Sequence, residues 1–118
     1  MLEAICLATV IYLEARGETF KGQQAIGHVV FNRAKKLNKP ICVVAKQPKQ
    51  FAYYNLLWKQ RQTTQYTQAY TIATNILGSK SINPIGRSTF FHADYVNPYW
   101  AKNKIIYRKI GKHVFYSR

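Results

Sequence analysis

The segment from residue 63 to residue 78 carries the clearest helical signal in the chain. Apolar and aromatic side chains recur there at helical spacing, namely Tyr66, Ala69, Tyr70, Ala73, Ile76 and Leu77. Thr63 or Thr64 can cap the start of this helix, and Gly78 can end it. Such a stripe predicts an amphipathic helix whose apolar face packs against other elements of a helical core.

Two more helices are predicted before it. The first is indicated by Leu2, Ile5, Cys6, Thr9, Val10 and Leu13, with Gly17 as a stop signal. The second stripe consists of Ala25, Ile26, Val29, Val30, Arg33, Ala34 and Leu37, and Thr19 is its candidate N-cap. Pro40 closes that region, and residues 41–46 predict a short helical turn. Residues 47–62 have no clean period and predict a loop or an irregular hairpin rich in aromatic residues.

The last third of the sequence has a different character. Turn signals occur at Asn83-Pro84 and Ile85-Gly86, "STFFHA" is typical of a strand, and "VNPYW" of a turn. The tail "IIYRKIGKHVFYSR" predicts a hairpin that turns near Gly111. The chain is therefore expected to form one α+β domain over residues 1–118, mainly helical and large enough to bury a core.

The charge of the chain limits its partners. Eighteen Lys and Arg residues against four Asp and Glu give a net charge of +14. Such a field attracts nucleic acid, anionic membranes or acidic wall polymers. The tail interleaves basic and aromatic residues, as single-strand nucleic-acid binders do. Its apolar residues alternate as in a strand, which argues against a membrane-disrupting helix.

Cysteine content and the N-terminus bear on location. Cys6 and Cys42 can form one disulfide or remain two buried thiols, and the sequence leaves this open. The three histidines are dispersed and form no zinc motif. The N-terminus lacks a secretory signal, and its apolar run is too short to span a bilayer. We therefore expect synthesis in the cytoplasm and another route to any task outside.

The stretch "IYLEARGE" contains Glu14 and Glu18, half of all the acidic residues. Burial beside the preceding apolar run would raise the pKa of Glu14, as a general acid requires, whereas the surrounding positive charge would lower it. On pattern alone, a glutamate at a helix end is more often an ordinary solvated residue. Glu18 follows Gly17, so we expect it to accept backbone N–H bonds or to meet the N-terminal end of the second helix.

Five motifs follow one another from about Cys6 to Tyr116: "IYLEARGE", "GQQAIGHVVFNRA", "ICVVAKQPKQF", "STFFHADYVNPYWA" and "IGKHVFY". In this order they resemble the cell-wall hydrolase family typified by the spore-cortex lytic enzyme SleB. The resemblance implies a lysozyme-like core, related to goose-type lysozyme and lytic transglycosylases, with a small β portion. It also implies peptidoglycan glycan strands as substrate and neither a cofactor nor a metal.

The resemblance further implies roles for individual residues. It makes Glu14 the catalytic acid and Glu18 its support, and it predicts substrate contacts from Gln50, Phe51, Phe91 and His92. Phe91 stands where the family frequently has tyrosine, so this chain lacks one hydroxyl there. The pairs Gly22-Gln23 and Asn32-Arg33 match family positions that we interpret as scaffold. Four loop aromatics are candidates either for sugar stacking or for partial core: Trp58, Tyr95, Tyr99 and Trp100.

Two reactions suit a lysozyme-like site. A hydrolysing muramidase needs a second carboxylate, for which Glu18 and Asp94 are the candidates, whereas Glu3 lies roughly 16 Å along the helix from Glu14. A lytic transglycosylase needs one acid and gives 1,6-anhydro-muropeptides. We expect the transglycosylase, acting as a monomeric phage-type endolysin. Nonspecific attraction to anionic wall polymers or the membrane surface is expected, but no specific nucleic acid. The alternatives are the muramidase and a nucleic-acid-binding module without catalysis.

Overall fold

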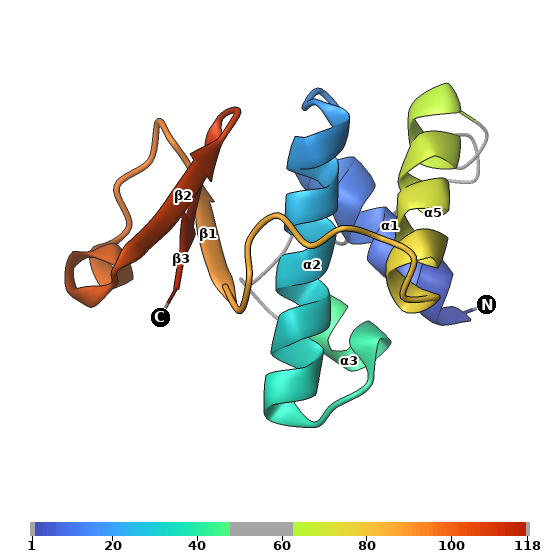
Figure 1. Cartoon of the computed structure of the whole chain (residues 1–118), viewed down its shortest axis with the longest axis horizontal. Coiled ribbons are helices and arrows are strands. Elements are labelled where there is room, and N and C mark those ends of the chain that lie inside the picture. The colour runs from blue at the N-terminus through green and yellow to red at the C-terminus, as the bar shows by residue number, and fades with distance from the viewer. Residues whose placement is uncertain (1, 48–62, 118) are drawn as a thin grey trace.

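The structure is a computed structural model that describes residues 2–47 and 63–117. Its α-helices are α1 (Leu2–Ala15), α2 (Phe20–Leu37), α3 (Ile41–Ala45) and α5 (Thr64–Leu77). Among the described helices, α1 contacts α2, α3 and α5, and α2 stands between α1 and the sheet (Figure 1). None of the described helices is long and apolar enough to span a membrane.

Local capping signals in the sequence position the ends of the helices. The Thr19 hydroxyl accepts a hydrogen bond from the Gly22 N–H at 3.2 Å, which confirms Thr19 as the N-cap of α2. Thr63 caps α5 in the same way, through the N–H of Tyr66 at 3.2 Å. Gly78 ends α5 as predicted, but its φ is −86°. The left-handed residue is instead Ser79, with a φ of 59°, so the chain turns one residue later.

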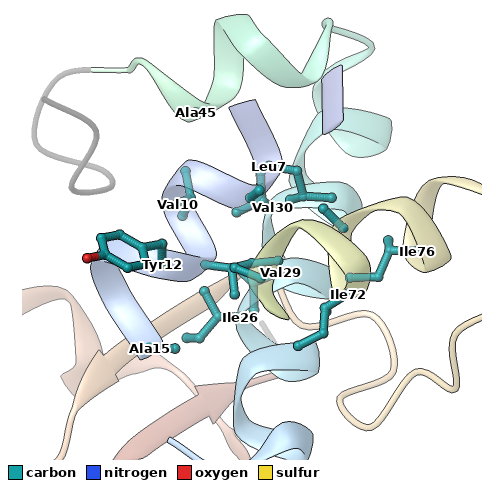
Figure 2. Packing of buried hydrophobic residues seen from close by; sticks show 14 of the residues in the cluster. Leu7, Val10, Tyr12, Ala15, Ile26, Val29, Val30, Ala45, Ile72 and Ile76 are labelled. Atoms are coloured by element: carbon teal, nitrogen blue, oxygen red, sulfur yellow. The ribbon is translucent and has the colours of Figure 1, made fainter. Parts of the chain in front are cut away.

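The core gathers around α1. Leu7, Val10 and Ile11 of this helix are fully buried against Ile26, Val29 and Val30 of α2 and Ile72 and Ile76 of α5 (Figure 2). Gly27 lets α2 approach α1 closely, because a Cβ added at Gly27 would lie 2.9 Å from the Ile11 side chain. A helix that is apolar on nearly all sides belongs at the centre of a bundle. The end of α1 is therefore held rigidly against the other helices.

A disulfide joins Cys6 of α1 to Cys42 of α3, with the two Cα atoms 5.2 Å apart. Of the two states that the sequence left open, the structure contains the bridge. It fixes the five-residue helix α3, which otherwise packs through Ile41, Val44 and Ala45. A helix this short has little stability of its own, so the bridge and these buried side chains together hold it.

The C-terminal third forms a small antiparallel sheet of strand order β1-β3-β2. Its strands are β1 (Phe90–Ala93), β2 (Ile106–Ile110) and β3 (His113–Tyr116), so the predicted strand joins the predicted hairpin. The predicted turn at "VNPYW" leads into a 3-10 helix, Tyr99–Asn103. The α+β prediction, mainly helical with a small β portion, is thereby confirmed.

Candidate active site

Glu14 lies in the last turn of α1, where the central helix of the bundle reaches the surface. Its side chain is half-buried, and the neighbouring residues Ile11, Tyr12 and Ala15 are buried. Tyr12 and Ala15 mark this end of the core cluster (Figure 2). The structure thus places the predicted acid on a rigid element, at the boundary between the packed core and solvent.

Glu18 lies in the connection between α1 and α2, and it ties this connection to the β2–β3 hairpin. Its Oε1 accepts a hydrogen bond from the backbone N–H of Lys112 at 3.1 Å, and its own carbonyl accepts one from Gln23 Nε2 at 3.1 Å. Gly111 makes this contact possible, because it adopts a φ of +57° and a Cβ there would overlap Glu18 Oε1. Glu18 thus makes one of the two contacts that its place after Gly17 predicts, and its support of catalysis stays a prediction.

Phe91 and His92 lie on opposite faces of the sheet. Phe91 packs on the core side, with its ring 5.5 Å from that of His113 and 6.0 Å from that of Phe115. His92 belongs to the other face, where its ring lies 5.7 Å from Trp100 and 5.4 Å from Tyr116. Successive side chains of a strand alternate in direction. The two predicted substrate-binding residues therefore do not form one binding surface.

Both ring nitrogens of His92 are engaged within the protein. The Nδ1 lies 2.7 Å from the carbonyl oxygen of Ala93, so Nδ1 carries the proton and donates it. The Nε2 lies 2.6 Å from the hydroxyl of Tyr116, and in the neutral ring it accepts from that hydroxyl. These bonds orient His92 within the sheet. Its ring nitrogens bind groups of the protein itself and are not free to bind a substrate.

His113 is a further residue of this region, for which the sequence analysis above assigns no role. It begins β3, directly after the Gly111–Lys112 turn that meets Glu18, and it is 6% exposed. Its Nδ1 is buried and makes no hydrogen bond within the described part of the chain. Burial lowers the pKa of His113, while the carboxylates of Glu18 and Asp94 act to raise it and His92 to lower it. The lowered pKa therefore keeps the His113 ring neutral near pH 7.

This environment predicts how stability varies with pH. Because the pKa of His113 is lower in the folded state than its ordinary 6.5, the unfolded chain binds more protons below that pH. We expect the free energy of unfolding to be maximal above pH 6.5 with respect to this group and to fall as the pH drops. Urea unfolding of wild type and His113→Gln between pH 5 and 8 measures the effect, and the variant should show a shallower decline.

His28 provides a comparison for that measurement. Burial lowers its pKa as well, and its Nε2 lies 2.9 Å from the Ser81 hydroxyl, far from the hairpin in sequence. His28→Gln should remove a separate part of the same pH dependence. A pH profile of His113→Gln that matches wild type in shape would contradict the assignment to His113.

The pair Asn32-Arg33, interpreted as scaffold from the sequence, makes scaffold contacts. Asn32 donates from Nδ2 to the carbonyls of Gly86 at 2.8 Å and Ser88 at 3.0 Å. Arg33 donates to the carbonyl of Thr89, with Nε 3.0 Å away. These bonds fix the segment that leads from α5 across α2 into β1 (Figure 1). They therefore set the position of the sheet relative to the helices.

The remaining candidates separate into three groups. Gln50, Phe51 and Trp58 lie outside the described residues. Tyr95 and Tyr99 are 84% and 87% exposed, whereas Trp100 packs against Phe90, His92 and Tyr116. Among residues 2–47 and 63–117, no three His, Cys, Asp or Glu side chains are grouped to hold a metal ion.

Comparison with known proteins identifies the family. The family model for the cell wall hydrolases matches residues 17–116. The chain belongs to the cell wall hydrolase family. The matched range includes Glu18 and His113 but begins after Glu14, so the role of Glu14 remains a prediction. A search of curated protein sequences found no match.

Two solved structures share the fold of this cell wall hydrolase. One is the catalytic domain of the germination-specific lytic transglycosylase SleB from Bacillus anthracis, with a TM-score of 0.78 and 24% identity over 98% of this chain and 93% of that one. The other is the catalytic domain of the Bacillus cereus SleB protein, with a TM-score of 0.73 and 25% identity over 99% and 91%. The similarity to the SleB fold that the motifs implied is confirmed.

Proposed function

We propose that this cell wall hydrolase cleaves the bond between N-acetylmuramic acid and N-acetylglucosamine in peptidoglycan, as a lytic transglycosylase with Glu14 as its acid. Family membership supports action on the wall, and the fold shared with a SleB lytic transglycosylase supports the reaction. The observation that carries the single-acid mechanism is the commitment of the alternative carboxylates, Glu18 and Asp94, to contacts with the hairpin.

Those contacts are specific. Glu18 accepts from the N–H of Lys112, and Asp94 forms an ion pair with Lys109 at 3.2 Å. A muramidase requires its second carboxylate to face the sugar, as a nucleophile or as a base for water. Carboxylates that hold the turn and strand of a hairpin are poorly suited to that task. Glu3, at the start of α1, lies at the far end of the helix from Glu14.

The proposed reaction needs two proton transfers by one group. Glu14 first protonates the glycosidic oxygen as the bond from that oxygen to C1 of the muramoyl residue breaks. Its carboxylate then takes the proton from the C6 hydroxyl of the same residue, whose oxygen bonds to C1 and closes the 1,6-anhydro ring. No water is consumed. Glu14 is half-buried in the last turn of α1, beside the buried residues Tyr12 and Ala15, where the end of the helix reaches solvent.

Product analysis tests the reaction type. Digestion of purified peptidoglycan should release muropeptides that end in 1,6-anhydro rings, each lighter by one water than the corresponding muramidase product. Repeating the digestion in water enriched in heavy oxygen should add no label, because no water enters the bond. Mass spectrometry reads both results, and a water-adding muramidase is the control. Labelled reducing ends would instead establish the hydrolysing mechanism.

Two parts of the prediction concern biology rather than chemistry. The phage-type endolysin role and monomeric state stay predictions. Action on a wall outside the cytoplasm is compatible with the Cys6–Cys42 bridge, since disulfides persist mainly in oxidising surroundings.

A further inference from the structure

Two adjoining hollows lie between the C-terminal half of α2 and the segment that enters β1. The first has a volume of about 260 Å³ and is lined by Asn32, Lys35, Lys36, Arg87 and Thr89. The second, of about 270 Å³, is lined by Arg33, Lys36, Leu37, Gln47, Thr89 and Phe90. Lys36 and Thr89 line both hollows, so the two adjoin, and we call them together the α2 groove.

The α2 groove is strongly positive. Four of its lining residues are cations and none is acidic. The acidic residues of the chain lie elsewhere: Glu3 and Glu14 are on α1, Glu18 meets the hairpin, and Asp94 pairs with Lys109. Lys36 and Arg87 are exposed, so their charges are available to a ligand, whereas Lys35 Nζ lies 5.4 Å from the centroid of the Phe31 ring. The groove thus concentrates part of the +14 charge of the chain in one concave strip.

The dipole of α2 explains only part of this arrangement. Lys35 and Lys36 lie in the last turn of α2, where cations stabilise the helix end. Arg87, however, belongs to the connection before β1 and has no helix end to stabilise. Arg33 adds a fixed cation beneath the groove, where it is 8% exposed and binds the Thr89 carbonyl. These cations come from separate segments and converge on one groove.

Two of the neutral polar groups that line the groove are used within the protein. Asn32 donates its amide to the carbonyls of Gly86 and Ser88, and the Thr89 carbonyl accepts from Arg33. Few neutral hydrogen-bonding groups are therefore available to read sugar hydroxyls. What the groove offers outward is charge, so an anionic chain fits it better than a neutral glycan does.

The same lining argues against nucleic acid. Single-strand binders combine basic residues with aromatic rings on which bases stack. Among residues 2–47 and 63–117, no aromatic residue lines the first hollow, and Phe90 is the one aromatic residue that lines the second. Its ring is already in contact with two cations, Arg33 at 4.8 Å and Lys104 at 3.8 Å from the ring centroid. The described lining of the groove therefore offers no free aromatic ring on which a base could stack.

We propose that the α2 groove binds a phosphodiester-linked polyol chain, an anionic polymer with one charge per repeat and no bases. Each hollow accommodates one repeat, and Lys36 lies between them. Binding here is distinct from the proposed cleavage of glycan strands, since it involves none of the residues that we assign to the reaction. Its effect is to hold the enzyme on a wall that carries such polymers.

Binding of fluorescent poly(glycerol phosphate) by full-length protein tests this site. The groove variant Lys36→Glu with Arg87→Glu should bind at least about tenfold more weakly than wild type, and its affinity should depend less steeply on salt. The matched control is Lys21→Glu with Lys80→Glu, which changes the net charge equally. Lys21 lies roughly 22 Å from Lys36 along α2, and the control should lose less than about threefold. Lys36→Gln with Arg87→Gln should show an intermediate loss and guards against misfolding of the first variant.

The comparison uses the Glu14→Gln background, so that binding is read without cleavage and independently of the proposed reaction. Equal losses in groove and control variants would mean diffuse attraction and would overturn the site. Single-stranded DNA of equal charge, or vesicles of anionic lipid, should bind more weakly and without preference for the groove. Tighter binding of either one, lost on groove substitution, would overturn the choice of ligand.

Discussion

Glu14→Gln is expected to abolish glycan cleavage while the fold stays intact. The amide keeps the size of the carboxyl but can neither donate a proton to the glycosidic oxygen nor accept one from the C6 hydroxyl. General acid–base groups typically contribute roughly 10²–10⁴-fold, and here one group would serve both steps. The release of soluble muropeptides from purified peptidoglycan should fall by at least that factor, as measured by mass spectrometry over a time course.

The matched control lies on the same helix. Glu3→Gln makes the identical chemical change in the first turn of α1, where the side chain is exposed. It should leave the rate of muropeptide release within about twofold of wild type, because surface substitutions away from the site have small effects. Thermal unfolding of both variants should match wild type closely. If Glu14→Gln retained full activity, the acid would have to be sought elsewhere in the chain.

The helices could be predicted from the sequence because their signals are local. The hydroxyls of Thr19 and Thr63 each cap a helix by accepting a hydrogen bond from the backbone N–H three residues later. The apolar periodicity of α1 and α5 likewise needs no knowledge of the partner helix. The backbone N–H contact of Glu18 could also be predicted, because a residue beyond Gly17 has left the helix and must find other partners.

The site itself depends on long-range contacts that the sequence does not display. Predicting that Glu18 accepts the N–H of Lys112 requires the hairpin to be docked beside the α1–α2 connection, 94 positions later in sequence. His113 becomes a buried neighbour of Glu18 only through that docking. By contrast, the opposed faces of Phe91 and His92 could have been inferred, since strand alternation alone separates neighbouring side chains.

The groove illustrates the same limit for charge. A net charge of +14 predicts attraction to polyanions but not the place where they bind. Lys36 and Arg87 are 51 positions apart by residue number, and the Asn32 bonds to Gly86 and Ser88 bring their segments together. The series of motifs favoured the hypothesis of an enzyme over that of a nucleic-acid-binding module. Membership of the cell wall hydrolase family supports the enzyme.

Loss of the Cys6–Cys42 bridge is expected to cause the largest change in stability. The bridge closes a loop with a sequence separation of 36, for which the chain-entropy model gives about 4 kcal/mol. Native domains are stable by only about 5–15 kcal/mol in total. Cys6→Ala with Cys42→Ala should therefore lower the Tm by roughly 10–20 °C, as followed by circular dichroism. Alanine is chosen because Cys6 is fully buried in the core, where a serine hydroxyl would need a partner.

A reducing agent separates the bridge from the substituted side chains. It should lower the Tm of wild type toward that of the double variant and leave the double variant unchanged, because only wild type has a bridge to reduce. Glu14 lies at the far end of the same α1 from Cys6, so cleavage at a temperature where both forms stay folded should change little. Equal melting of wild type with and without reductant would contradict a stabilising bridge. The expected result means that the enzyme gains much of its stability only in oxidising surroundings, which is where a bacterial wall is found.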